Sequence, residues 1–435
     1  MSKVRIDFTN SIGKIKPMHA VNNGPARENA VRRDNFKTFK ELKIPYSRNH
    51  DAGLSEDYGG GHVVDVHNIF TDFSRDVDDE EAYDFALTDE YTRVITAAGA
   101  EVFYRLGTSI EHWKKKYGSI MPADFGKWAK ICEHIIRHYT EGWASGYHYN
   151  IAYWEIWNEP DLDSDNCTDK RCWSGTRQEF LEFYTVVAKY LKNKFPDLKI
   201  GGPASAGNEN FMREFLRHIS QKHVQLDFFS WHIYSTDPSE MMMKAERVKT
   251  YLDEFGYSDA ESILNEWNYI EDWEGKKFLD SIKVIKGMKG AAFAAAVMCA
   301  GQHCPVLDML MYYDARNDKE YNGLYSSDTL EPIKGYYSFK MFSELYQIGE
   351  QTLSESDDKE IYVVSAANSE KQAALICYYT MNEDAGEKMV QVEMPEAVGF
   401  ECYLLDASTN CEKVELLHDN QIVMHPNTVV LLKKS

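Results

Sequence analysis

Two glutamates stand at the ends of apolar runs of this sequence, where a carboxylate is least expected. Glu159 follows the run 152–158 in the stretch YWEIWNEPDL, and Glu266 lies near the end of the run 262–267, SILNEW. A carboxylate among large apolar side chains costs stability unless chemistry uses it. Two opposed carboxylates can act as acid and as nucleophile, which is the equipment of glycoside hydrolysis. We therefore expect Glu159 and Glu266 to be catalytic.

The elements that must position these glutamates follow a repeating pattern. From about residue 15 to 345, short apolar runs alternate with longer segments in which apolar residues recur at three and four residue steps. The eight runs are 14–21, 44–50, 101–107, 152–158, 198–204, 226–234, 262–267 and 306–314. Continuous apolar runs, each followed by a helix, predict a closed (β/α)8 TIM barrel buried on both sides. The predicted catalytic barrel spans residues 15–345.

The positions of the glutamates within this barrel favour a catalytic role. A single glutamate at a strand end is more often a neighbour of a helix N-terminus or a member of a surface ion pair. Glu159 and Glu266 end the fourth and seventh runs, however, and polar residues at the strand ends of a barrel have a raised prior for function. Two glutamates three units apart on one ring can face each other across a single mouth.

A doubly wound open sheet is the main alternative fold. It would normally carry a glycine-rich phosphate loop directly after its first strand, and the sequence has none there. The glycine run YGGGH, residues 58–62, is not followed by a helical pattern, and we interpret it as a flexible loop.

The texture of the sequence changes after about residue 350. Short strand-like runs separated by turn residues then follow one another to the end, which is typical of a small antiparallel β-sandwich. We expect this second domain to span residues 346–435 and to pack firmly on the barrel. The opening segment 1–14 contains another strand-like run, KVRIDF, which we expect to join the same sheet.

Other polar and aromatic residues follow the ends of the apolar runs and are candidates for substrate binding. They are Arg48, His50, His112, Trp113, Asn158, His232, Tyr234, Trp267, Asp314 and Arg316. Sugar faces stack on aromatic rings, so Trp113 and Trp267 are the candidate stacking platforms, although most rings must belong to the core. The histidines are candidates for binding hydroxyl groups.

Composition restricts the partners of the chain. The formal charge of −21 repels nucleic acid and anionic membranes, and no apolar run is long enough to span a bilayer. No cluster has the spacing of a metal site, and carboxylate chemistry needs no cofactor. Eight scattered cysteines and the absence of an export signal predict free thiols, including Cys167 and Cys172, and a cytoplasmic location. A second copy of the chain stays open as a partner.

Several motifs together resemble a known family. EIWNEPDL, SWHIY and ILNEWNY, with RNHD upstream and GLYSSDTLEPIKGYYSF downstream, are similar to the retaining β-glycosidases of glycoside hydrolase family 39. The resemblance covers most of the chain and implies that Glu159 is the general acid/base, Glu266 the nucleophile, and Asn158 a donor to the sugar 2-hydroxyl. It also implies an oligosaccharide or small glycoside as substrate, with an exo-acting β-xylosidase as the leading interpretation.

These roles carry physical expectations. A retaining mechanism requires carboxyl groups about 5 to 5.5 Å apart. Trp157 and Pro160 should raise the pKa of Glu159, whereas Arg48 and the Tyr234 hydroxyl should keep Glu266 ionised. Three alternatives stay open: a uronic-acid-specific enzyme in which Arg316 reads a sugar carboxylate, a transglycosidase, and a non-catalytic sugar-binding protein. The segment MYYDARND around Asp314 departs from the tryptophan-rich pattern that we associate with xylosidases.

Overall fold

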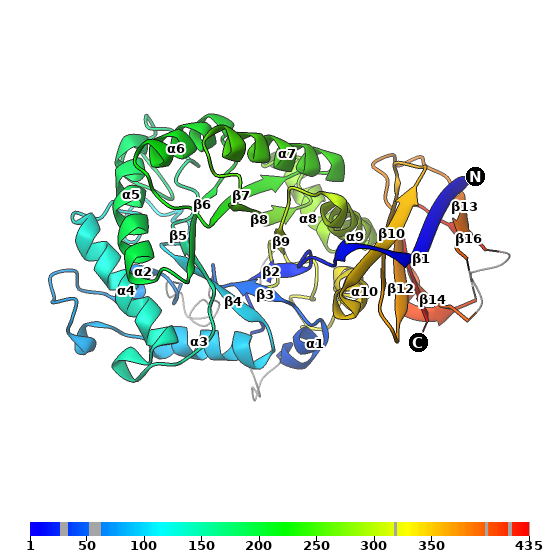
Figure 1. The fold of residues 1–435 in the computed structure, drawn as a ribbon, viewed down its shortest axis with the longest axis horizontal. Helices are drawn as coiled ribbons and strands as arrows, with labels where there is room; N and C mark the ends of the chain where they lie inside the picture. The colour runs from blue at the N-terminus through cyan, green and yellow to red at the C-terminus, as the bar shows by residue number, and fades with distance from the viewer. Residues whose placement is uncertain (27–33, 52–61, 317–319, 396–398, 416–419, 435) are drawn as a thin grey trace.

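The computed structural model describes residues 1–26, 34–51, 62–316, 320–395, 399–415 and 420–434. Its larger part is a closed barrel of parallel strands surrounded by helices (Figure 1). The sequence-based prediction of a TIM barrel is therefore confirmed. The glycine run 58–62 lies outside the described residues except for His62.

The barrel strands pair in sequence order, and the last closes on the first. They are β2 (Ala20–Asn22), β3 (Tyr46–Arg48), β4 (Glu101–Leu106), β5 (Tyr153–Ile156), β6 (Lys199–Ser205), β7 (Phe228–Tyr234), β8 (Glu261–Asn268) and β9 (Met309–Tyr312). Glu159 thus follows the fourth barrel strand, β5, and Glu266 lies on the seventh, β8. Both positions lie toward the C-terminal ends of the strands, where barrel enzymes carry their active sites.

Helices surround the barrel, and the last two in the chain lie between it and the second sheet (Figure 1). The helices are α1 (Phe36–Glu41), α2 (Val66–Ile69), α3 (Ala86–Ala97), α4 (Phe125–Thr140), α5 (Arg177–Lys194), α6 (Glu209–Gln221), α7 (Pro238–Glu254), α8 (Gly275–Ile285), α9 (Met288–His303) and α10 (Lys334–Ile348). α5 begins with a capping box in which Thr176 and Glu179 satisfy each other's backbone donors. Its buried face includes Phe180, Tyr184, Val187 and Leu191. Among the described residues no single helix has the length and apolarity to cross a membrane, and α8 with α9 meets that test only as a pair bent by 78°.

The interior of the barrel is layered. An apolar layer near the start of the strands contains Ala20, Phe103, Tyr153, Phe228, Ile263, Met309 and Met311. Because side chains two residues apart on a strand share a face, the next layer comes from positions two residues further along. That layer is polar and buried, and its members are Asn22, Arg48, Arg105, Glu155 and Asn265. The polar layer forms the floor beneath the mouth of the barrel.

The second part of the molecule is one continuous sheet. Its order is β15-β14-β17-β12-β11-β10-β1-β13-β16, and the sheet is antiparallel except for the parallel pair of β1 and β13. The strands are β1 (Ser2–Lys14), β10 (Glu350–Ser356), β11 (Ile361–Ala367), β12 (Gln372–Tyr378), β13 (Lys388–Glu393), β14 (Glu401–Leu405), β15 (Asn410–Val414), β16 (Gln421–Met424) and β17 (Thr428–Lys434). The region expected to form a sandwich is thus a single mostly antiparallel sheet, in which β1 pairs with β10 and β13.

Both faces of this sheet are apolar, which explains how it holds to the barrel. One face, with Val4, Ile6, Val363 and Ile376, encloses a small core of its own. The other face packs on α9 and α10 as part of the main core, and Figure 1 shows these two helices between barrel and sheet. The alanine-rich α9 permits a close approach, since the Cys377 Sγ lies 3.3 Å from the Ala292 carbonyl oxygen.

Candidate active site

The backbone after β5 turns sharply and places Glu159 in the mouth of the barrel. Trp157 has φ of 76° and Glu159 has φ of 47°, values that residues other than glycine seldom adopt. The Trp157 amide donates to the Leu106 carbonyl at 2.7 Å, and the Glu159 amide donates to the Ala204 carbonyl at 2.9 Å. These bonds to both neighbouring strands hold the turn in place. Trp157 joins the outer core against Trp128, while Glu159 lies in the mouth.

An irregularity in β8 brings Glu266 into the same mouth. Trp231 pairs with Leu264 and His232 pairs with Glu266, so β8 carries Asn265 as one extra residue between the pairs. Such a bulge breaks the usual alternation of side chains. Asn265 bonds Glu155 in the polar layer at 2.6 Å, and Glu266 also turns inward.

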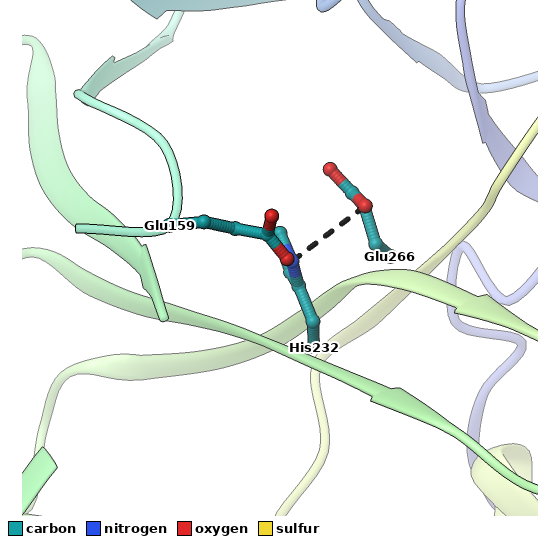
Figure 2. A group of neighbouring side chains, drawn as sticks. All are labelled: Glu159, His232 and Glu266. Carbon is teal, nitrogen blue, oxygen red and sulfur yellow. Dashed lines mark hydrogen bonds and ion pairs between the residues drawn. The ribbon is translucent and has the colours of Figure 1, made fainter. Parts of the chain in front are cut away.

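The two glutamates and His232 form a tight cluster, shown in Figure 2. One carboxylate oxygen of each glutamate and one ring nitrogen of the histidine lie within 4.8 Å of one another. The His232 Nδ1 is 2.8 Å from Glu159 Oε1 and 3.6 Å from Glu266 Oε2. Oxygens this close are compatible with the carboxyl separation of about 5 to 5.5 Å typical of retaining glycosidases, and they do not favour the roughly 6.5 to 9.5 Å of inverting ones.

The same three groups offer ligand atoms for a metal ion, which the spacing of residues in the sequence did not indicate. Arg48 counts against a resident cation, because its Nη1 lies 2.8 Å from Glu266 Oε1 and its charge repels a metal ion at that position. The cluster is better matched to carboxylate chemistry.

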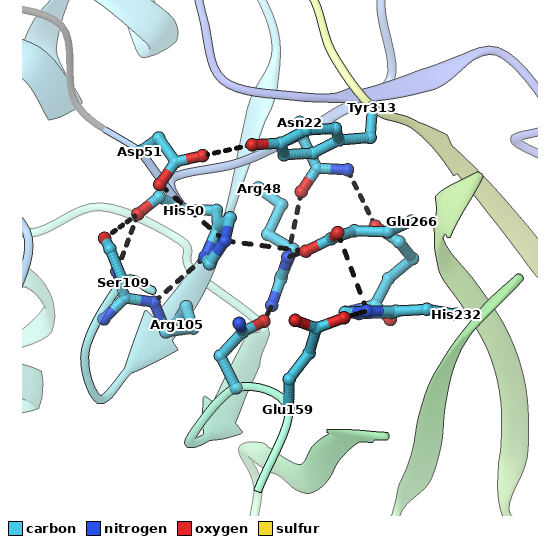
Figure 3. Close-up of polar contacts among 12 residues, drawn as sticks. Asn22, Arg48, His50, Asp51, Arg105, Ser109, Glu159, His232, Glu266 and Tyr313 are labelled. Atoms are coloured by element: carbon cyan, nitrogen blue, oxygen red, sulfur yellow. Dashed lines mark hydrogen bonds and ion pairs between the residues drawn. The ribbon is translucent and has the colours of Figure 1, made fainter. Parts of the chain in front are cut away.

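Arg48 organises the floor of the site (Figure 3). Its Nε donates to Glu155 at 2.7 Å, its Nη1 to Glu266 at 2.8 Å, and its Nη2 to the Asn158 side-chain oxygen at 2.7 Å. Nη1 also contacts the Asn22 side-chain oxygen at 3.0 Å. Glu155 and Asn22 were not among the residues predicted from the sequence. Glu155 did offer a signal, because it is a carboxylate inside an apolar run.

Burial sets the protonation of the two glutamates. Burial and, to a smaller extent, the neighbouring Asp161 carboxylate raise the pKa of Glu159 to about 8. Burial also raises the pKa of Glu266, although His232, Arg48 and the Tyr234 hydroxyl, which donates to it at 2.8 Å, act to lower it. Arg48 and Tyr234 act on the pKa of Glu266 in the expected direction, but burial is the larger effect on it. Two close carboxyls of raised pKa favour a state in which one is protonated and the other ionised.

His232 is neutral in this environment. Burial lowers its pKa to about 4, while Glu266 acts in the opposite direction. A neutral imidazole 2.8 Å from Glu159 orients that carboxyl group without adding a positive charge beside the two glutamates.

A second polar group lies beside the glutamates on the side of β3 and β9. His50 Nε2 is 3.5 Å from Glu266 Oε1, and Asp51 accepts a hydrogen bond from the Tyr313 hydroxyl at 2.8 Å. Arg316 lies 3.9 Å from Asp51 and 3.7 Å from Asp314. The structure therefore gathers His50, Asp314 and Arg316 near one another, together with Asp51, which we had not placed among the binding residues.

Three aromatic or histidine predictions do not fit this arrangement. Trp267 is wrong as a sugar platform because it is 0% exposed and packs outward against Phe293 and Tyr312. The bulge at Asn265 turns Glu266 inward and thereby turns Trp267 outward. His112 and Trp113 lie exposed in the loop after β4, and the contacts of the described residues do not link them to either glutamate.

The chain is similar to known glycoside hydrolases. The model of the family Glycosyl hydrolases family 39 matches residues 2–258. A curated β-xylosidase of Geobacillus stearothermophilus is 26% identical over 244 residues, which are 52% of this chain and 42% of that protein, so the match spans less than half of the relative. A solved glucosidase of Croceicoccus marinus has a TM-score of 0.80 at 21% identity, covering 100% of this chain and 98% of that one. A family 39 β-xylosidase of Caulobacter crescentus has a TM-score of 0.72 at 17% identity, covering 100% and 99%.

Proposed function

The chain belongs to glycosyl hydrolase family 39, and from that premise we propose that it hydrolyses β-glycosides, with β-xylosides as its substrates, and retains the anomeric configuration. The observation that carries the proposal is the approach of Glu159 and Glu266 to within 4.8 Å, with Arg48 and Tyr234 bonded to Glu266. The choice of xylose is supported by the similar curated β-xylosidase.

In the first step Glu266, as a carboxylate, attacks the anomeric carbon, and Glu159 gives its proton to the departing oxygen. The pKa of about 8 at Glu159 suits this donor, because it stays protonated at neutral pH. Once Glu266 is esterified its charge is lost, so Glu159 ionises more readily and takes a proton from the attacking water. The bond to Glu266 then breaks and the sugar leaves with its original configuration.

Asn158 is placed to hold the sugar. Its side-chain oxygen accepts from Arg48, and its buried side-chain nitrogen has no partner among the described residues. A buried donor without a partner costs stability in the empty site, and a sugar hydroxyl would satisfy it. This supports the role of Asn158 as a donor to the 2-hydroxyl.

The uronic-acid alternative is less well supported. Arg316 lies between the carboxylates of Asp51 and Asp314, at 3.9 and 3.7 Å, so its charge is already balanced by the protein. An arginine that reads a sugar carboxylate needs charge left to offer.

A panel of aryl β-glycosides tests the proposal, with xyloside, glucoside, galactoside and glucuronide arms. We expect the xyloside to be cleaved with the highest kcat/KM and proton NMR to detect β-xylose before mutarotation. First release of α-xylose would contradict retention. Binding without hydrolysis of any arm would instead identify a non-catalytic sugar-binding protein.

A further inference from the structure

An exposed indole stands beside the nucleophile and is unused in the mechanism above. Trp273, in the loop between β8 and α8, is 54% exposed. Its ring lies edge-on to that of Tyr234, with centroids 4.8 Å apart and an interplanar angle of 77°. The Tyr234 hydroxyl in turn donates to Glu266 at 2.8 Å. A single residue therefore separates the exposed indole from the reacting carboxylate.

Other rings fix the position of Trp273. Phe278 lies nearly parallel to it at 6.3 Å, and Tyr321 lies at 6.5 Å. Tyr321 contacts Tyr313, whose ring also lies 6.5 Å from that of Tyr234. An exposed tryptophan normally leaves apolar area in water at a cost in free energy. Because other rings pack against Trp273, its exposed apolar face keeps a fixed position beside the site.

The polar groups and Trp273 reach the mouth from different strands. His50 and Asp51, which we consider candidates for binding sugar hydroxyls, come from the end of β3, and Figure 3 shows them on the far side of Glu266 from His232. Trp273 instead contacts Tyr234 on β7, the strand that also provides His232 as the partner of Glu159. In the proposed mechanism Glu159 protonates the oxygen of the leaving group. The leaving group therefore lies on the side of the site where Glu159 is.

We propose that Trp273 is the stacking platform of a leaving-group subsite, which binds the flat apolar face of an aryl ring or of a second sugar. This inference rests on the proposed glycosidase function. It replaces Trp267, which the sequence suggested and which faces the core. Stacking on an aromatic face strengthens binding about two- to thirteenfold, since such contacts are worth roughly 0.5–1.5 kcal/mol.

Three substrates with the same sugar and different leaving groups test the proposal in the full chain. β-Xylosyl fluoride has an activated leaving group without a ring, 4-nitrophenyl β-xyloside has an aryl ring, and xylobiose has a second sugar. For Trp273→Ala we expect kcat/KM to fall about two- to thirteenfold with the aryl xyloside, with xylobiose or with both, and less than twofold with the fluoride. The substrate that suffers identifies the source of the flat face.

Two further variants complete the test. Trp273→Phe should recover most of the loss, because it restores a ring. Trp113→Ala, a change at an indole that is 77% exposed outside the network, should not distinguish the three substrates. If Trp273→Ala lowered kcat/KM equally for the fluoride, or lowered it for none of the substrates, the proposed role of Trp273 would be wrong. A wild-type chain that cleaves none of the three would contradict the proposed function itself, so the two failures are distinguishable.

Discussion

Arg48 and Glu155 form an ion pair at 2.7 Å with both side chains fully buried, directly beneath the two glutamates of the site. The same guanidinium binds Glu266 at 2.8 Å. One positive charge is therefore shared by two carboxylates. Glu155 thereby limits how strongly Arg48 can lower the pKa of Glu266, which we propose as the nucleophile.

Glu155→Gln tests this sharing. Glutamine keeps the shape of the side chain, but the charge of Arg48 then acts on Glu266 alone. A carboxylate with a stronger cation partner has a lower pKa and attacks less readily. We expect the acid limb of the kcat/KM profile to move to lower pH and the rate of glycosyl-enzyme formation to fall about tenfold or more. The free energy of unfolding, measured in urea, should fall by roughly 1–3 kcal/mol.

The matched control is Glu261→Gln. Glu261 also lies on a barrel strand, but it pairs with the partly exposed Lys199 at the opposite end of β8. Its replacement should lower the free energy of unfolding by less than about 1 kcal/mol and should not shift the pH dependence of kcat/KM. An acid limb that stays fixed in a folded Glu155→Gln protein would show that Glu155 acts only as a structural support.

The alkaline limb should report the proton of Glu159. Because the pKa of this group is about 8, kcat/KM should fall as the pH rises through that value and the donor ionises. Asp161 is held near Glu159 by the Ser205 hydroxyl at 2.7 Å and by the Ala206 amide at 2.8 Å. Asp161→Asn removes a negative neighbour, so Glu159 ionises more easily and the alkaline limb should move to lower pH.

Asp165→Asn is the control for this shift, because Asp165 lies in the same loop and bonds the Arg177 amide at the start of α5. Its profile should match that of the wild type. A limb that moves to higher pH in Asp161→Asn, or moves equally in both variants, would contradict the assignment of the limb to Glu159.

The barrel could be predicted from the sequence because its strands are continuous apolar runs and because apolar residues recur every three to four positions in its helices. The pair Glu159 and Glu266 could be found because each ends such a run. The sheet after residue 350 was recognised from its short strands, but pairing between distant strands has no local signal. Its single continuous order, with β1 between β10 and β13, therefore emerged only from the structure.

The parts of the site that escaped prediction depend on closure of the barrel. Asn22, Glu155 and Asn265 come from three strands and meet only in the polar layer around Arg48. The bulge in β8 adds one residue to a strand, and strict alternation then assigns Trp267 to the wrong side. Trp273 lies in a loop, where no periodicity marks which ring will face the site.

The cysteines give a prediction that is independent of catalysis. All eight are described and free, six of them buried, while Cys167 and Cys411 are partly exposed. Titration of the denatured protein without reductant should find eight thiols. In the native protein Cys167 should react first, because burial raises the pKa of the Cys411 thiol. A count of six after denaturation would mean that one disulfide forms in the purified protein.

The roles of the two glutamates can be separated by leaving groups and by an external nucleophile. Glu159→Ala removes the proton donor, which matters greatly for a sugar alcohol but little for an activated aryl group. Glycosyl-enzyme formation from an activated xyloside should therefore survive, while its breakdown slows for want of a base. Azide attacks without base assistance, so it should restore turnover and give a β-glycosyl azide.

Glu266→Ala removes the attacking group itself, and activity should fall by several orders of magnitude with good and poor leaving groups alike. Any rescue by azide must then be a direct displacement at the anomeric carbon, which gives the α-azide. His232 and Arg48 both contact Glu266. A general loss of structure in the site would lower the activity of both variants. Opposite azide configurations cannot arise from such a loss. If both variants gave the same anomer, or if Glu159→Ala lost activity equally on good and poor leaving groups, the two roles would be wrongly assigned.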